Sequence, residues 1–327
     1  LQSSQNITAI LFNMIKMINK REIATDLITL RDLIRWGTSQ FNAAELSYSQ
    51  GMPSAIDEAA YLCLSALHLP PDFSVDYFDC VLTMEERLNV LNLFEQRIIQ
   101  RKPSAYITNE AWFSGLSFYV DERVLIPRSP IAELIQQQFS PWVQAENVDA
   151  ILDLCTGSAC IAIACAYAFE HAQVDESDVS TDALAVAEIN RQNHGVENRV
   201  HLIESDLFES IPAKRYDVIV SNPPYVSEAE MTQLAAEFEH EPGLLALTAG
   251  EDGLDLVLPI LKRAADFLTD DGILIVEVGY SQAALERVLP TVPFLWIDFE
   301  FGGEGVLLLT SSQLQAHQAD IAKAMNG

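Results

Sequence analysis

The sequence predicts an α/β protein with a mainly parallel sheet of about seven strands and a terminal antiparallel hairpin. A small helical domain and a β-hairpin linker are expected to precede this sheet. Two observations carry the prediction. Apolar residues recur at helical spacing through the first third of the chain, and after residue 126 short apolar runs alternate with helical patterns. Such alternation is typical of a parallel sheet that is covered by helices on both faces.

The first third of the chain predicts helices. Apolar residues recur at helical spacing over residues 27–41 and again over 56–67. A third helical pattern begins at Thr83, whose hydroxyl group forms a capping-box signature with Glu86 three residues later. We therefore expect a helical domain over residues 17–104.

The remainder of the chain predicts a hairpin and then a sheet. Residues 105–126 alternate aromatic and β-branched side chains and are broken at Ser114-Gly115, which predicts the β-hairpin linker. The last two strand candidates are joined by residues 301–304, so they predict an antiparallel strand at or near the sheet edge. The chain is expected to end in a polar, frayed tail over 313–327. The strand candidates lie at 148–156, 173–179, 199–204, 216–221, 272–278, 294–300 and 305–310.

The composition is that of a folded and strongly acidic protein. The 327 residues are 49% hydrophobic, and 19 Lys and Arg against 47 Asp and Glu give a net charge of −28 at pH 7. A chain with this apolar fraction forms a packed core, and its length suggests about two domains. The negative potential disfavours broad contact with nucleic-acid backbones or anionic membranes, because both rely on Lys and Arg. It suits a basic partner.

Cysteine spacing and hydropathy predict a soluble cytoplasmic protein. The five cysteines form no C-x-x-C pair, which argues against a zinc site and for reduced thiols. The apolar segment 7–18 is too short to span a membrane and lacks the basic start of a signal peptide. Residues 1–16, which precede Met17, are expected to be an extension that takes no part in the fold.

Polar residues follow three of the predicted strands. The first strand ends in the turn 153–160, which has the single glycine Gly157, whereas a dinucleotide fingerprint needs three, so NAD fits poorly. Asp178 ends the second strand, where a carboxylate can bind a ribose hydroxyl pair, and Asp206 ends the third. Because parallel strands bring their carboxyl ends to one edge of the sheet, these positions together predict a nucleoside pocket.

The most specific motif is Asn222-Pro223-Pro224-Tyr225, directly after the fourth strand. Two prolines remove backbone donors and stiffen the turn, so the Asn222 side chain and nearby carbonyl groups project in fixed directions. A planar NH2 group can donate to the Asn222 side-chain oxygen and to a backbone carbonyl, while Tyr225 offers a ring face. The turn therefore predicts a site for a planar amino group.

These motifs resemble those of a known family. The turn at 222–225 and the run DLCTGSACIAIA resemble Rossmann-like class I methyltransferases that use S-adenosylmethionine to methylate planar nitrogens. The segment 105–135 is similar to the hairpin region of the protein-(glutamine-N5) methyltransferases. Within it, Pro127-Arg128-Ser129-Pro130 resembles the branch that acts on ribosomal protein L-3 more than the release-factor branch. The resemblance covers most of residues 25–312, including 29–41 and 240–256.

The resemblance implies S-adenosylmethionine as cofactor and a glutamine of an L-3 type ribosomal protein as methyl acceptor. It also implies that residues 17–104 recognise the substrate and that 127–312 bind the cofactor. Ala159 occupies a position where the family has Gly, and its methyl group could crowd the methionine end of the cofactor. The implied cofactor residues are Cys155, Thr156, Gly157, Ser158 and Ala159 for the methionine end, Asp178 for the ribose, Asp206 and Leu207 for the adenine, and Asn222. The implied substrate residues are Asn222, Pro223, Pro224 and Tyr225, of which Asn222, Pro223 and Tyr225 are the catalytic candidates.

Three other functions stay open from the sequence. Adenine or guanine NH2 groups are also planar, so a nucleic-acid amino-methyltransferase would fit the same turn, although it needs a basic surface. A release-factor glutamine is an alternative acceptor. A binding module that retains the fold without activity would be consistent with Ala159. The expected partners are a basic ribosomal protein and ribosome assembly intermediates, without membrane or sequence-specific nucleic-acid contact.

Overall fold

The fold is described from a computed structural model, which covers residues 20–48, 50–227, 235–242, 248–300 and 302–325. The expected extension at residues 1–16 lies outside these ranges. The chain divides into two units. The first unit holds the described residues up to Asn109 together with Ala235–His240, and the second holds the others. The return of residues 235–240 to the first unit had no signal in the sequence.

The first unit is helical, as predicted. Helix α5 begins after Thr83, whose hydroxyl group accepts from the Glu86 amide while the Glu86 carboxylate accepts from the Thr83 amide, so the predicted capping box is confirmed. Leu33, Phe41 and Phe94 are fully buried at its core. The helices are α2 (Lys20–Asp26), α3 (Leu30–Ala43), α4 (Ala55–Ala66), η1 (Val75–Tyr77), α5 (Met84–Glu95), η2 (Gln96–Gln100), α6 (Ser104–Thr108) and η4 (Ala236–His240).

A buried charge cluster joins η4 to this unit. Arg97 is only 1% exposed, and its Nε atom donates to Glu58 Oε1 at 2.9 Å. The Arg97 Nη1 atom donates to Glu237 Oε1 at 3.3 Å, and Nη2 donates to the Ser47 carbonyl oxygen at 2.6 Å. Both carboxylates are buried, and the positive charge that makes their burial tolerable comes from Arg97 and, for Glu237, also from Arg101, whose Nη2 atom lies 2.9 Å from Glu237 Oε1.

The second unit is built on a sheet with the order β5-β4-β3-β6-β7-β9-β8. The neighbouring strands β5, β4, β3, β6 and β7 are parallel. Strand β9 runs antiparallel to both β7 and β8, which confirms the terminal antiparallel hairpin. Only residues 295–296 of the predicted strand 294–300 pair in the sheet. The strands are β3 (Ala150–Leu154), β4 (Gln173–Asp178), β5 (Val200–Glu204), β6 (Tyr216–Ser221), β7 (Leu268–Glu277), β8 (Leu295–Trp296) and β9 (Val306–Thr310).

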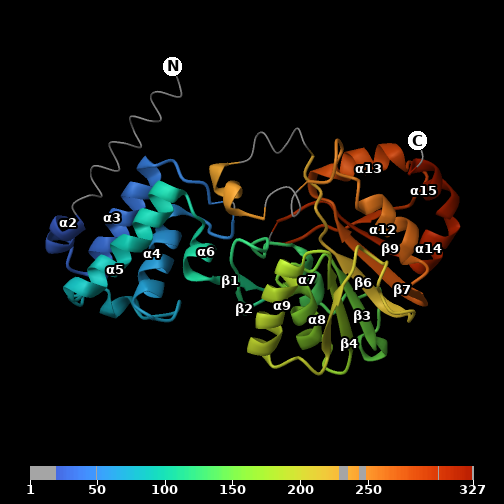
Figure 1. Cartoon of the computed structure of the whole chain (residues 1–327), viewed down its shortest axis with the longest axis horizontal. Helices are drawn as coiled ribbons and strands as arrows, with labels where there is room; N and C mark the ends of the chain where they lie inside the picture. The colour runs from blue at the N-terminus through green and yellow to red at the C-terminus, as the bar shows by residue number, and fades with distance from the viewer. Residues whose placement is uncertain (1–19, 49, 228–234, 243–247, 301, 326–327) are drawn as a thin grey trace, which may run out of the picture. The chain divides into compact units, whose positions relative to one another are not determined.

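Helices cover both faces of this sheet, as Figure 1 shows. On one face Ile151 and Val218 pack against α7 to α9, and on the other Leu152 and Ile219 pack against α12 to α15. Strands β3 and β6 therefore place apolar side chains on both faces, as parallel strands usually do. The helices are α7 (Ile131–Gln136), α8 (Cys160–Ala168), α9 (Thr181–His194), α12 (Val257–Ala264), α13 (Gln282–Val288), α14 (Ser311–Ala316) and α15 (Gln318–Ala324), with the short turns η3 (Ala145–Asn147) and η5 (Gly279–Ser281).

The two ends of this unit differ in part from the sequence expectation. The predicted hairpin forms from β1 (Glu110–Phe113) and β2 (Leu116–Tyr119) with its turn at Ser114-Gly115, but it starts after residue 105 because Ser104–Thr108 is helical. The expectation of a frayed C-terminal tail is wrong as far as Ala324. Leu314 and Ile321 are fully buried, since α14 and α15 pack on the α12 side of the sheet.

Candidate active site

A cavity of about 310 Å³ opens at the carboxyl ends of β3 to β6. This volume lies within the range of small-molecule sites. The cavity gathers most of the residues that the sequence singled out. Those that line it are Cys155, Thr156, Gly157, Ser158, Asp178, Asp206, Leu207, Asn222 and Pro224, whereas Ala159, Pro223 and Tyr225 do not.

The turn between β3 and α8 forms one wall of the cavity. Its backbone takes positive φ angles of 59° at Cys155, 57° at Gly157 and 66° at Ala159. Asp153, which is fully buried below the turn, accepts from the Thr156 hydroxyl at 2.6 Å and from the Ala162 amide at 3.2 Å. These bonds hold a strained turn in one conformation.

Ala159 departs from the sequence expectation. Its side chain is fully buried in the core cluster beside α8 and does not line the cavity. The methyl group therefore contacts protein atoms. The free-energy cost of Ala159 comes from its left-handed backbone conformation, which residues other than Gly, Asn and Asp adopt rarely. The Ala159 side chain therefore does not crowd the cavity, and we expect Ala159 to affect the stability of the turn.

Asp178 stands at the end of β4 and borders the turn. Its Oδ2 atom accepts from the Gly157 amide at 3.0 Å, and its Oδ1 atom accepts from the Ser180 amide at 2.9 Å. Burial raises the pKa of this carboxyl group, while the backbone bonds act in the opposite direction. Each oxygen retains a lone pair that can accept a hydrogen bond from a hydroxyl group of a ligand.

The next strand ends in a second fixed turn. Asp206 and Leu207 both line the cavity after β5, and Leu207 has a φ of 46°. The Ser205 hydroxyl donates to the Leu207 carbonyl oxygen at 2.8 Å and also accepts from the Ser210 amide at 2.9 Å. These two bonds fix the backbone at Leu207, whose side chain lines the cavity, and they do not involve the Asp206 carboxylate.

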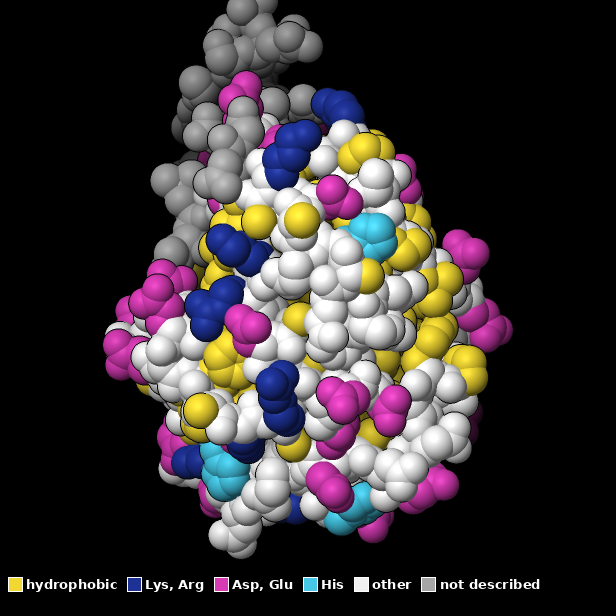
Figure 2. Space-filling model, turned by 90° about the vertical axis from the view of Figure 1, so that its right-hand side faces the viewer, with side chains coloured by type: hydrophobic (Ala, Val, Ile, Leu, Met, Phe, Trp, Pro, Cys, Tyr) yellow, Lys and Arg dark blue, Asp and Glu magenta, His cyan; other side chains and the backbone are white. Residues whose placement is uncertain are grey.

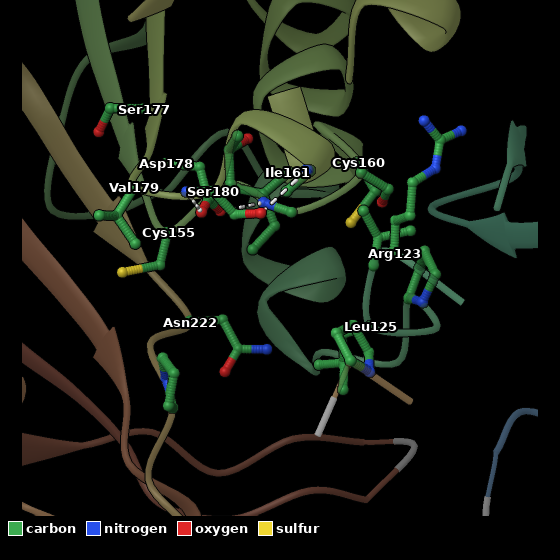
Figure 3. A pocket seen from close by; sticks show the side chains of 18 of the residues that line it. Arg123, Leu125, Cys155, Cys160, Ile161, Ser177, Asp178, Val179, Ser180 and Asn222 are labelled. Carbon is green, nitrogen blue, oxygen red and sulfur yellow. Dashed lines mark hydrogen bonds between the residues drawn. The ribbon is translucent and has the colours of Figure 1, made fainter. Parts of the chain in front are cut away.

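The proline turn follows β6. Figure 3 shows the Asn222 side chain projecting into the space between Cys155 and Leu125. No other described residue makes a hydrogen bond to this side chain. Pro223 is buried, and the Tyr225 hydroxyl donates to Glu277 Oε1 at 2.8 Å, so the Tyr225 ring is part of the packed wall behind the turn.

Several residues of the site had no signal in the sequence. Asn190 of α9 donates through Nδ2 to the Ser158 carbonyl oxygen at 2.9 Å and also bonds the backbone of Tyr119, so it joins the hairpin to the first turn. Glu176 lies beside Asp153 on the neighbouring strand and is fully buried. Burial raises the pKa of Asp153 to about 7 and that of Glu176 to about 8.

Two of the cysteines lie at the cavity. Cys155 and Cys160 line the cavity, and burial raises the pKa of Cys160 to about 12, so it stays a thiol at neutral pH.

In the described ranges, no three His, Cys, Asp or Glu side chains are grouped so that they could hold a metal ion. No helix in the same ranges has the length and apolar character that crossing a bilayer requires.

Comparisons with known proteins agree with this geometry. The methyltransferase small domain family matches residues 136–242. A ribosomal protein uL3 glutamine methyltransferase of Xanthomonas campestris is 48% identical over 92% of this chain and 97% of its own length. One of Francisella tularensis is 46% identical over 90% of this chain and 94% of its own. A solved methyltransferase structure from Pyrococcus furiosus covers 60% of this chain and 89% of its own at 18% identity and a TM-score of 0.44, too distant to bear on function. The chain therefore belongs to the family of the ribosomal protein uL3 glutamine methyltransferases.

Proposed function

We propose that this chain transfers a methyl group from S-adenosylmethionine to the side-chain amide nitrogen of a glutamine in an L-3 type ribosomal protein. The observation that carries the proposal is the position of Asn222. Its side chain enters the same cavity as the Gly157 turn and Asp178, on a chain that shares 46% and 48% identity with two uL3 glutamine methyltransferases.

The residues present in the cavity fit S-adenosylmethionine. The Asp178 carboxylate would accept the ribose hydroxyl groups, and the apolar side chains of Val179 and Leu207, which both line the cavity, would flank the adenine base. The turn of Cys155 to Ser158 would border the methionine end. When bound, this cofactor supplies an electrophilic methyl group on a sulfonium centre.

The chain's own residues would orient the acceptor amide. A carboxamide nitrogen is a poor nucleophile because its lone pair is delocalised into the carbonyl group. The Asn222 Oδ1 atom and the Pro223 carbonyl oxygen would each accept one amide hydrogen, which holds the nitrogen in place and favours its pyramidal form as it attacks. The proton that the methylated nitrogen then carries is strongly acidic and passes to water.

Charge favours a protein acceptor over a nucleic acid. The chain carries a net charge of −28, and in Figure 2 the Lys and Arg side chains of the displayed face are separated by acidic, polar and apolar ones. A basic ribosomal protein would be attracted by this potential, whereas a phosphate backbone would be repelled. A cytoplasmic location, where ribosomes are assembled, stays a prediction.

The proposal is tested with ribosomal components from a strain that lacks the gene. The purified protein and S-adenosylmethionine with a labelled methyl group are added to them, and protein and RNA are then separated. Label in one large-subunit protein, on a glutamine-containing peptide, is the expected result. Label in RNA would favour the nucleic-acid alternative, and label in a release factor would favour the other glutamine substrate.

A further inference from the structure

A buried carboxyl group without a sequence motif lies behind the Asn222–Tyr225 turn. Glu277 is the last residue of β7 and is 6% exposed. Its Oε1 atom accepts from the Tyr225 hydroxyl at 2.8 Å, and its Oε2 atom accepts from the Ser129 hydroxyl at 2.5 Å. Ser129 lines the cavity, while Glu277 itself does not. One carboxyl group thus joins the proline turn to the segment that follows the hairpin.

The Glu277 carboxyl group is held by two hydrogen bonds and lies near a positive charge. Burial raises the pKa of Glu277, while the bonds from Ser129 and Tyr225 and the nearby Arg128 charge lower it. Arg128 is itself fixed, because its Nη2 atom donates to Glu241 Oε2 at 2.8 Å. Two hydroxyl donors and one cation therefore compensate a carboxyl group that is removed from water.

Tyr225 is constrained at three points. Its hydroxyl group is bonded to Glu277, and its carbonyl oxygen accepts from the Ser281 hydroxyl at 3.0 Å. Its ring lies against Gly279, where the φ is 47° and an added Cβ atom would be 2.5 Å from the ring atom Cε2. Since two prolines of restricted φ connect Tyr225 to Asn222, a fixed Tyr225 also restricts the backbone from which the Asn222 side chain projects.

We propose that Glu277 is a positioning residue for methyl transfer, which holds Tyr225 and Ser129 so that the Asn222 side chain faces the acceptor amide. This inference rests on the proposed function, in which the turn binds the planar amide. Orientation of this kind has large kinetic effects, because a displacement of about 1 Å at a reacting group can lower a rate roughly 100-fold.

The variants Glu277→Gln and Tyr225→Phe test the inference. Gln keeps the shape of Glu but replaces one acceptor oxygen with an NH2 donor, so at most one of the two hydroxyl groups keeps its acceptor, and Phe removes the Tyr225 hydroxyl group. Each variant should lower kcat about 10- to 100-fold, with the KM for S-adenosylmethionine changed by less than about twofold. The losses in the double variant should not multiply, because both substitutions weaken the shared hydrogen bonds among Ser129, Glu277 and Tyr225.

Tyr216→Phe is the matched control. The Tyr216 hydroxyl donates to Asp175 Oδ2 at 2.6 Å, and this fully buried tyrosine begins β6, the strand that Asn222 follows. The control loses the same kind of bond far from the turn, so its melting temperature should fall while kcat is kept.

The outcomes separate positioning from simple stabilisation. If Glu277→Gln and Tyr225→Phe melt earlier but keep the wild-type kcat, as Tyr216→Phe does, the inference is wrong. If the two losses multiply in the double variant, the shared-bond explanation is wrong. If the wild-type chain transfers the labelled methyl group to a different acceptor, the proposed substrate is wrong. The same variants measured on that acceptor would then decide the role of Glu277.

Discussion

The carboxylate of Asp178 accepts a hydrogen bond from the backbone amide of Gly157 at 3.0 Å, which joins the ends of β4 and β3 at the cavity. The two residues lie at the ends of neighbouring parallel strands, so the bond fixes the acid beside the turn that borders the methionine end in our proposal. Asp178 therefore has a structural partner on one side and the cavity on the other.

Replacing Asp178 should weaken cofactor binding. A hydrogen bond to a charged group contributes about 1.5–3 kcal/mol, so Asp178→Asn should raise the dissociation constant for S-adenosylmethionine roughly 10- to 100-fold. Isothermal titration calorimetry measures this change. The exposed Asp182 at the start of α9 provides the control, and Asp182→Asn should bind as the wild type does. Equal affinity of the two variants would remove Asp178 from the proposed ribose site.

Ala159 should respond to a change of backbone freedom. With a φ of 66° and a fully buried methyl group, Ala159→Gly should raise the free energy of unfolding by up to about 1 kcal/mol and leave cofactor affinity unchanged. Chemical denaturation and calorimetry measure the two quantities.

Gly195 supplies the reverse substitution for Ala159. Its φ is 64°, and an added Cβ atom there meets nothing within 4 Å, so Gly195→Ala should destabilise the fold by a similar amount. A tighter affinity for S-adenosylmethionine in Ala159→Gly would instead show that the Ala159 methyl group does crowd the cofactor.

The carboxyl pair below the turn predicts how stability depends on pH. Burial raises the pKa of Asp153 from 3.8 to about 7 and that of Glu176 from 4.5 to about 8. The folded chain therefore binds these protons more tightly than the unfolded chain does. Their contribution to the free energy of unfolding is fully present below about pH 4 and is lost as the pH rises towards 8.

Glu176→Gln should flatten this pH dependence. The amide cannot ionise, so the free energy of unfolding should fall less between about pH 5 and about pH 8 than it does in the wild type. Urea denaturation at several pH values measures it. Glu146→Gln, at an exposed position, serves as the control. If Glu176→Gln follows the wild-type curve, Glu176 does not titrate in this range.

Arg97 should contribute far more to the free energy of unfolding than an exposed arginine does. Arg97→Ala leaves Glu58 buried without its cation and leaves Glu237 with Arg101 alone, which should cost about 3–5 kcal/mol of unfolding free energy. Arg31→Ala breaks a salt bridge to Asp79 in which both side chains are more than half exposed, and should cost about 0–1 kcal/mol. Thermal and urea denaturation compare them, and equal losses would contradict the role assigned to the buried cluster.

Local sequence patterns predicted the frame of the site well. The strands β3 and β6 are short, mainly apolar runs with polar residues directly after them, and β4 ends at Asp178, so the sequence alone places Gly157, Asp178 and Asn222 at one sheet edge. The Thr83 capping box was predicted for the same reason, because its two partners are three residues apart.

Contacts between distant residues were not predictable from one sequence. Glu277 meets Ser129 across 148 positions, and Arg97 meets Glu237 across 140, so neither pair produces a periodic or local pattern. The length of β8 was overestimated because the alternation of residues 294–300 resembles a strand, although only Leu295 and Trp296 pair with β9. The buried Leu314 and Ile321 were missed because they are isolated apolar positions in a polar segment.

Asn222 is the residue that, in our proposal, presents a glutamine amide to the methyl donor. Peptide mass spectrometry tests this role most directly, on an L-3 type ribosomal protein incubated with S-adenosylmethionine and either the wild-type chain or Asn222→Ala. We expect one methyl group on one glutamine with the wild-type chain. With Asn222→Ala, methylation should be slowed at least about 100-fold although cofactor affinity is kept. Near-normal glutamine methylation by Asn222→Ala would show that the amide is held by other groups.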